Sequence, residues 1–182
     1  GNGSAVSSAV VIGGEIVSAF TFLIIGFASG GTVLISQYVG ARRGEDVEQT
    51  IGTLLTLFAL AAVFMTAVMH IAARPFLILL RTPAESFENA CSYMQICMLG
   101  NFFVFEYNAI SSVLNGTGDS KRPLIFVTIS GTLNVFLDLL FVAGFKMGPN
   151  GSAWATVLSQ AVSFVISAAY LIRKSSIFRL TR

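Results

Sequence analysis

A carboxylate and an amide lie one helical turn apart in an apolar stretch of this sequence. Asn134 and Asp138 have the i, i+4 spacing that places two side chains on the same face of a helix. Their oxygens suit a hard cation such as Na⁺, and a carboxyl group can also carry a proton. Because charged side chains are costly inside a membrane, such a residue is a candidate functional group. The pair predicts a cation site, with a hydrogen bond from Asp138 to another helix as the structural alternative.

A second apolar stretch carries a longer polar face. Its members recur at helical intervals: Asn101, Asn108, Ser111, Ser112 and Asn115. In a membrane such a face points into the bundle or an aqueous cavity, or it joins helices by hydrogen bonds. Glu106 points about 200° away from this face. It has two interpretations, contact with a substrate or contact, in protonated form, with another helix.

The composition indicates that these residues belong to a membrane protein. Of 182 residues, 54% are hydrophobic and 11% charged, and the mean hydropathy is +0.79. Soluble domains have about 25% charged residues. The net charge of +2 gives no basis for a nucleic-acid partner. The sequence has no nucleophile–base set, phosphate-binding loop or zinc-ligand spacing, so we expect no enzyme activity, no cofactor and no metal beyond Na⁺.

Five apolar segments predict an all-α, multi-pass transmembrane bundle without separate domains. The expected spans cover residues 8–39, 51–73, 86–114, 124–145 and 152–172. They are long and do not alternate, which favours helices over barrel strands. Basic residues gather at the ends that are cytoplasmic if the first span starts outside. These residues are Arg42, Arg43, Lys121, Arg122, Arg173, Lys174, Arg179 and Arg182.

Four motifs in this order resemble the multidrug and toxic compound extrusion family, within a superfamily that includes lipid and polysaccharide flippases. They are SQYVGA at residues 36–41, GTGDSKRP at 116–123, NVFLD at 134–138 and GPNGSAWAT at 148–156. The resemblance implies helices 2 to 6 of a twelve-helix transporter that has two six-helix lobes. The chain would then be an incomplete first lobe, with helix 1 and the second lobe elsewhere in the same protein.

The resemblance also implies a function and a site. Family members in the cell membrane exchange H⁺ or Na⁺ for small organic compounds, often cationic, by alternating access. Their first-lobe cation site carries over to Asn108, Asn134, Asp138 and Thr156, with Ser111 at a further position. The substrate-cavity candidates are Glu106, Asn101 and Gln37. The alternatives are a lipid-linked oligosaccharide flippase, for which more basic cavity residues are expected, and a channel subunit.

Overall fold

The computed structural model describes residue 22 and residues 24–79 and 84–180, which are helical apart from short turns. The helices are a segment at Ile24–Gly40, α2 at Gly44–Leu79, α3 at Ala84–Gly116, α4 at Lys121–Asp138 and α5 at Gly148–Leu180. A π-helical turn at Leu139–Gly144 continues α4. No strand occurs in these residue ranges, so the predicted all-α fold is confirmed.

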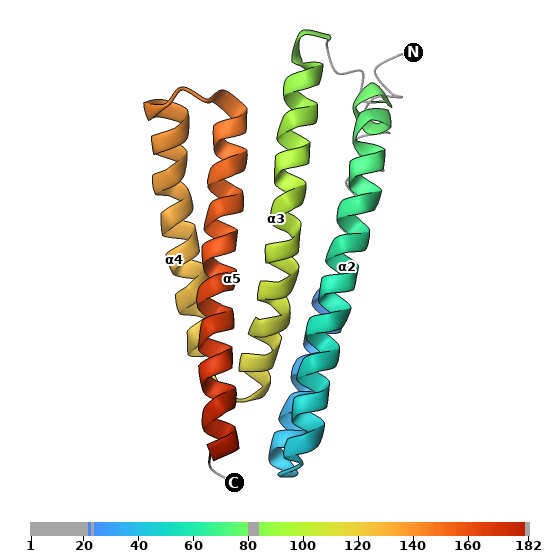
Figure 1. Cartoon of the computed structure of the whole chain (residues 1–182), viewed down its shortest axis with the longest axis vertical. Helices are drawn as coiled ribbons and strands as arrows, with labels where there is room; N and C mark the ends of the chain where they lie inside the picture. Colours follow the sequence, from blue (N-terminus) through green and yellow to red (C-terminus); the bar gives the residue numbers. More distant parts are fainter. Residues whose placement is uncertain (1–21, 23, 80–83, 181–182) are drawn as a thin grey trace.

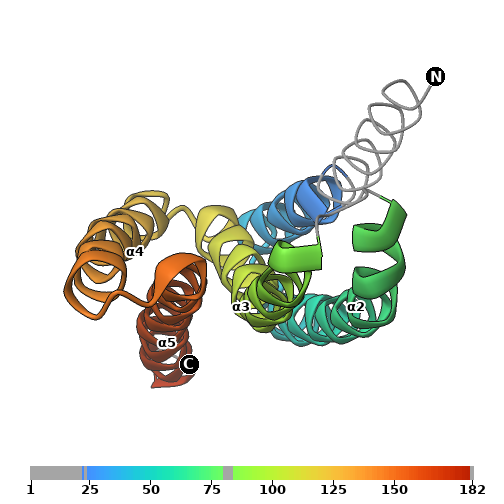
Figure 2. The ribbon, with the colours of Figure 1, turned by 90° about the horizontal axis from the view of Figure 1, so that it is seen from above.

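Consecutive helices run antiparallel along the long axis of the molecule (Figure 1). Seen from above, α3 occupies the middle, with α5 on one side and α2 on the other (Figure 2). The helix α4 packs mainly against α5. We call the end of the bundle at the 117–120 turn the motif end, and the end at the 145–147 turn the far end.

Four helices are long and apolar enough to cross a membrane, judged by length and composition. They are Gly44–Ile78, Phe87–Gly116, Lys121–Gly144 and Gly148–Lys174. Each of them overlaps one predicted span almost completely. Of the first predicted span, 8–39, only residue 22 and residues 24–39 are described, and the rest lies outside the described residues. The count of five spans therefore stays a prediction.

The buried core lies where α3 meets its neighbours. One cluster joins the 24–40 segment and α2 to α3, and it contains Phe58 and Phe105, whose ring centroids are 6.5 Å apart. A second cluster joins α3 to α4 through Ile110, Leu114 and Phe126. Many large apolar side chains point outward instead, in keeping with a helix bundle that has lipid as its solvent.

Small residues let the 24–40 segment approach α3 closely at the motif end. A Cβ on Gly116 would lie 2.9 Å from the Thr32 carbonyl oxygen and 2.8 Å from the Ile35 side chain. Beside this contact, Ser112 Oγ lies 3.0 Å from Thr32 Oγ1 and 2.5 Å from the Ala28 carbonyl oxygen, to which it donates a hydrogen bond. This polar contact therefore serves as the interhelical hydrogen bonding that the sequence offered as one interpretation of Ser112.

Candidate functional site

The interface between α4 and α5 brings two of the predicted cation ligands together. Asn134 Nδ2 donates a hydrogen bond to Thr156 Oγ1 at 3.3 Å, and the Thr156 hydroxyl donates to the Ser152 carbonyl at 3.0 Å. One turn toward the motif end, Ser130 Oγ donates to the Ser159 carbonyl at 2.8 Å and fixes the register of the two helices. Because its amide nitrogen faces Thr156, Asn134 presents its carbonyl oxygen away from this bond.

Asp138 lies one turn beyond Asn134, about 6 Å farther toward the far end. Its residue surface is partly exposed, but Oδ1 is buried and has no hydrogen-bond partner among the described residues. Tyr93 of α3 lies within electrostatic range of this carboxyl group. Since buried polar atoms are normally satisfied, an unpartnered carboxylate oxygen is suited to bind a proton or a cation.

The chain leaves the regular helix directly after Asp138. The π-helical turn Leu139–Gly144 begins at the next residue, and such turns often occur at functional sites. Beyond it, α5 starts close by, because a Cβ on Gly151 would lie 3.2 Å from the Phe141 backbone. Asn150 Oδ1 in this first turn of α5 is also buried without a partner in the described part of the chain. Two unused oxygen acceptors thus lie toward the far end, one near the end of α4 and one in the first turn of α5.

The two predicted ligands on α3 are bound within their own helix. Asn108 Nδ2 donates to the Val104 carbonyl at 2.7 Å, and Ser111 shares a hydrogen bond with Tyr107. Tyr107 in turn donates to the Pro123 carbonyl at 2.7 Å, which ties α3 to the first turn of α4. In the described residues, neither Asn108 nor Ser111 is hydrogen-bonded to Asn134 or Asp138.

The three substrate-cavity candidates do not gather at one place. Gln37 is exposed near the motif end of the 24–40 segment, where Ala41 N–H donates to its carbonyl. Asn101 is half-buried on α3. Glu106 is buried with 6% exposure and leaves Oε1 without a partner in the described part of the chain. Contact of these residues with a substrate therefore stays a prediction.

A cavity of about 410 Å³ lies elsewhere, between the 24–40 segment and α2. Its lining residues include Gly26, Gly30, Tyr38, Asp46 and Thr50. Gly26 and Gly30 have open space beside their Cα atoms. None of the predicted site residues lines this cavity. In the residues that the structure describes, no three His, Cys, Asp or Glu side chains gather as a metal site either.

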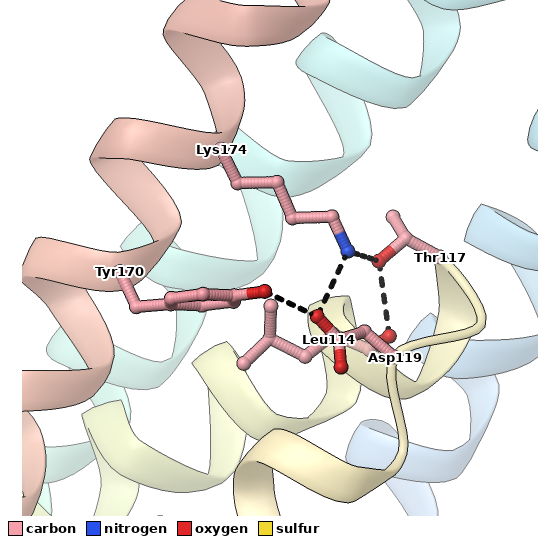
Figure 3. A network of polar contacts seen from close by, with 5 residues as sticks. All are labelled: Leu114, Thr117, Asp119, Tyr170 and Lys174. Atoms are coloured by element: carbon pink, nitrogen blue, oxygen red, sulfur yellow. Dashed lines mark hydrogen bonds and ion pairs between the residues drawn. The ribbon is translucent and has the colours of Figure 1, made fainter.

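A second polar cluster at the motif end was not predicted from the sequence. Asp119 accepts hydrogen bonds from the Tyr170 hydroxyl at 2.6 Å and from Lys174 Nζ at 3.4 Å (Figure 3). Lys174 Nζ also donates to Thr117 Oγ1 at 3.0 Å. We call Thr117, Asp119, Tyr170 and Lys174 the motif-end network. It fastens the turn between α3 and α4 to α5, some 50 residues later in the chain.

Local sequence explains how the turn can present Asp119 to α5. Gly118 has φ +84°, a left-handed conformation that glycine adopts without strain. Pro123 lies in the first turn of α4, where its missing N–H is not needed. The Arg122 guanidinium lies 5.1 Å from the centre of the Tyr170 ring, within cation–π distance of this member of the network.

The motif-end network holds Asp119 in its ionised form. The hydrogen bond from the Tyr170 hydroxyl is the main cause that lowers the pKa of Asp119 below its usual value. Partial burial opposes this shift, while the positive charges of Lys174 and Arg122 add to it. A motif in the sequence marked the turn, but only the fold could identify the partners on α5.

Similarity to known proteins extends over almost the whole chain. The MatE family model matches residues 2–140. A Bacillus subtilis (strain 168) protein named "Probable multidrug resistance protein YpnP" is 32% identical over 171 residues, which is 94% of this chain and 38% of that protein. The chain thus spans well under half the length of this relative.

Two solved structures of a multidrug resistance MATE family transporter of the MOP superfamily are also similar. The inward-facing structure superposes with a TM-score of 0.77 at 28% identity, covering 82% of this chain and 34% of that one. The outward-facing structure gives 0.80 at 26% identity, covering 92% and 37%. The chain therefore belongs to the MatE family and is a multi-pass protein of the cell membrane.

Proposed function

We propose that the protein exports small organic compounds in exchange for H⁺ or Na⁺, and that this chain supplies helices of one lobe. Family membership supports export, because the similar proteins are named multidrug resistance proteins and transporters. The observation that carries the coupling is the buried Asp138 Oδ1, which has no hydrogen-bond partner among the described residues. The neighbouring Asn134–Thr156 bond supports the same site.

In this proposal the cation binds to Asp138 and to the carbonyl oxygen of Asn134. The Thr156 hydroxyl holds the Asn134 amide nitrogen, so the amide oxygen is turned toward the incoming cation. The bound cation supplies the positive charge that balances the Asp138 carboxylate. The free Oδ1 of Asn150 extends the acceptor set toward the far end. Asn108 and Ser111 have their hydrogen-bond partners within α3 and do not contribute to this site in the described residues.

Alternating access then follows from differential binding. A cation drives the transporter toward one conformation only if that conformation binds it more tightly. The chain resembles an inward-facing and an outward-facing transporter to a similar degree, with TM-scores of 0.77 and 0.80. This favours a lobe that moves as a unit, with the change of access between lobes. Asn101 and Gln37 are then candidates for contact with the exported compound.

The decisive experiment uses Asp138→Asn in the full-length transporter. The substitution keeps the side-chain volume and removes the charge. We expect export from vesicles under an imposed H⁺ or Na⁺ gradient to fall by tenfold or more, because each ~1.4 kcal/mol of lost cation binding weakens affinity about tenfold. Transport is compared at equal transporter amounts.

The matched control is Asp119→Asn, which removes another aspartate of the same lobe outside the proposed site. This variant should keep its dependence on the ion gradient. Export by Asp138→Asn at the wild-type rate would contradict the proposed site. A saturating ion conductance without exported compound would instead support a channel subunit.

A further inference from the structure

The space between the 24–40 segment and α2 is not used by the proposed cation site. The cavity of about 410 Å³ lies in its half toward the motif end, and its volume falls in the usual range for drug-sized ligands. One wall is a face of the 24–40 segment with a lining residue at every fourth position: Gly26, Gly30, Leu34 and Tyr38. The other wall is a polar face of α2, formed by Asp46, Gln49, Thr50 and Thr53.

The α2 wall offers negative charge and oxygen acceptors. Thr50 Oγ1 donates to the Asp46 carbonyl at 2.7 Å, and Thr53 Oγ1 donates to the Gln49 carbonyl at 2.8 Å. Because both hydroxyl hydrogens are used within the helix, the hydroxyl oxygens remain as acceptors. Among the described residues that line the cavity, Asp46 alone is charged. This wall therefore favours a ligand that carries positive charge.

Away from the motif end the same space becomes apolar. A second cavity of about 350 Å³ adjoins the first at Phe27, which lines both. Its described lining residues are all apolar and include Leu57, Phe64 and Phe105. We call the two cavities together the 24–40/α2 groove. A ligand that complements both halves is amphiphilic, with a positive group attached to an apolar body.

A cation of the chain itself already occupies the polar end of the groove. Arg43 Nε donates to Asp46 Oδ2 at 2.7 Å, and the Arg43 guanidinium lies 5.3 Å from the centre of the Tyr38 ring. An aromatic face attracts guanidinium and quaternary ammonium groups alike, and a carboxylate beside it strengthens the attraction. The Arg43 side chain is 60% exposed and is not among the residues that line the cavity. It can therefore withdraw into solvent while the walls of the groove stay in place.

The groove is also separate from the proposed cation site. Seen from above, α3 lies between the 24–40 segment with α2 on one side and α5 with α4 on the other (Figure 2). Asp138 and Asn134 belong to α4. A compound in the groove and an H⁺ or Na⁺ at Asp138 thus share no ligand.

We propose that the 24–40/α2 groove binds amphiphilic organic cations, with their positive group at Asp46 and Tyr38 in place of Arg43. The apolar body then lies along Phe27 toward Leu57. This inference rests on the proposed export of organic compounds and adds where a cationic one binds to this lobe. Arg43 is an intramolecular competitor for the polar end, so its removal should strengthen binding of the cation.

The test is photocrosslinking of the full-length transporter in vesicles of phosphatidylglycerol, a lipid without an ammonium group. The probe is a benzophenone that carries a trimethylammonium group, and its neutral analogue carries a tert-butyl group of the same shape. Mass spectrometry locates the attached probe, and the concentration dependence of labelling gives its apparent affinity. We expect the cationic probe to attach to residues of the groove. Attachment only outside the groove would overturn the proposal.

Two variants remove the groups that hold the positive charge. Asp46→Asn should weaken binding of the cationic probe about threefold to fivefold, the range for a partly exposed ion pair, and leave the neutral analogue unaffected. Tyr38→Leu should weaken it about twofold to fivefold, whereas Tyr38→Phe keeps the ring and should bind as the wild type does. Equal losses for the charged and the neutral probe would contradict recognition of the charge.

Arg43→Gln should act in the opposite direction, because it vacates Asp46 and Tyr38. The cationic probe should bind severalfold more tightly, with no change for the neutral analogue. The matched control is Arg42→Gln, which removes the charge of the neighbouring exposed residue and leaves Arg43 on Asp46. Equal tightening in both variants would contradict competition by Arg43.

Binding and coupling fail separately in these measurements. Groove labelling that persists in Asp138→Asn while its gradient-driven export is lost would support both sites. Groove labelling together with undiminished export by Asp138→Asn would support the groove and contradict the proposed coupling site. Loss of export in Asp138→Asn without any groove labelling in the wild type would contradict the groove alone.

Discussion

Two aspartates of this chain stand at opposite ends of the contact between α4 and α5, and their surroundings differ. Asp119 at the motif end accepts hydrogen bonds from Tyr170 and Lys174, and Arg122 lies nearby. Asp138 toward the far end leaves Oδ1 buried and unpartnered in the described part of the chain. A satisfied carboxylate fastens a turn to a helix. An unsatisfied one has binding capacity left for a ligand that the folded chain does not supply.

The largest expected effect tests which end of the bundle, the motif end or the far end, faces the cytoplasm. Basic residues predict that the motif end is cytoplasmic. Ser120 lies in the turn of that end, directly before α4, and is exposed. A cysteine at Ser120 in the full-length protein should react with a membrane-impermeant reagent only from the cytoplasmic side. Labelling from outside in intact cells would show that the motif end faces outward, and it would place Asp138 in the cytoplasmic half.

The next effect tests whether Asp119 acts as a structural brace. Asp119→Asn removes the charge that pairs with Lys174 and weakens the bond from Tyr170. We expect a loss of about 1.5–3 kcal/mol in the free energy of unfolding, the usual size for hydrogen bonds to a charged group. The matched control is Asp46→Asn, which breaks an exposed 2.7 Å pair with Arg43 and should have a smaller effect.

The pH dependence of stability sharpens this prediction. In the folded protein the pKa of Asp119 lies below its usual value. Its contribution to stability is therefore present above the ordinary aspartate pKa, and it is lost as the pH falls through the lowered folded pKa. Thermal unfolding in detergent over an acidic pH series should show this loss in the wild type and a weaker one in Asp119→Asn. Equal acid sensitivity of both proteins would contradict the brace.

The sequence was sufficient to predict what depends on local pattern. Apolar length predicted four of the helices that the structure describes, and the i, i+4 spacing placed Asn134 and Asp138 on one face. Short motifs identified the family because they mark turns and helix starts. These features need only neighbouring residues, so the chain determines them before any tertiary contact forms.

Features that depend on packing between distant segments could not be predicted in this way. No periodicity pairs Asp119 with Tyr170, since 51 residues separate them. The helix angle of Glu106 showed that it points away from Asn108, but only the packing of the helices showed that it is buried, with 6% exposure. The apolar run 124–145 likewise gave no sign of the π-helical turn that follows Asp138.

The smallest expected effect concerns the bond that orients Asn134. Thr156→Val keeps the shape of the side chain and removes the hydroxyl that accepts from Asn134 Nδ2. The amide can then rotate, so its oxygen faces the cation for only part of the time. One neutral hydrogen bond contributes about 1 kcal/mol, or roughly a fivefold change in affinity. The H⁺ or Na⁺ concentration that gives half-maximal export should rise by that factor, while the maximal rate changes little.

Thr156→Ser retains the hydroxyl and should behave as the wild type. If Thr156→Ser weakens the ion dependence while Thr156→Val does not, the methyl group matters rather than the hydroxyl, and Thr156 would belong with the packed residues of α5 instead of the cation site.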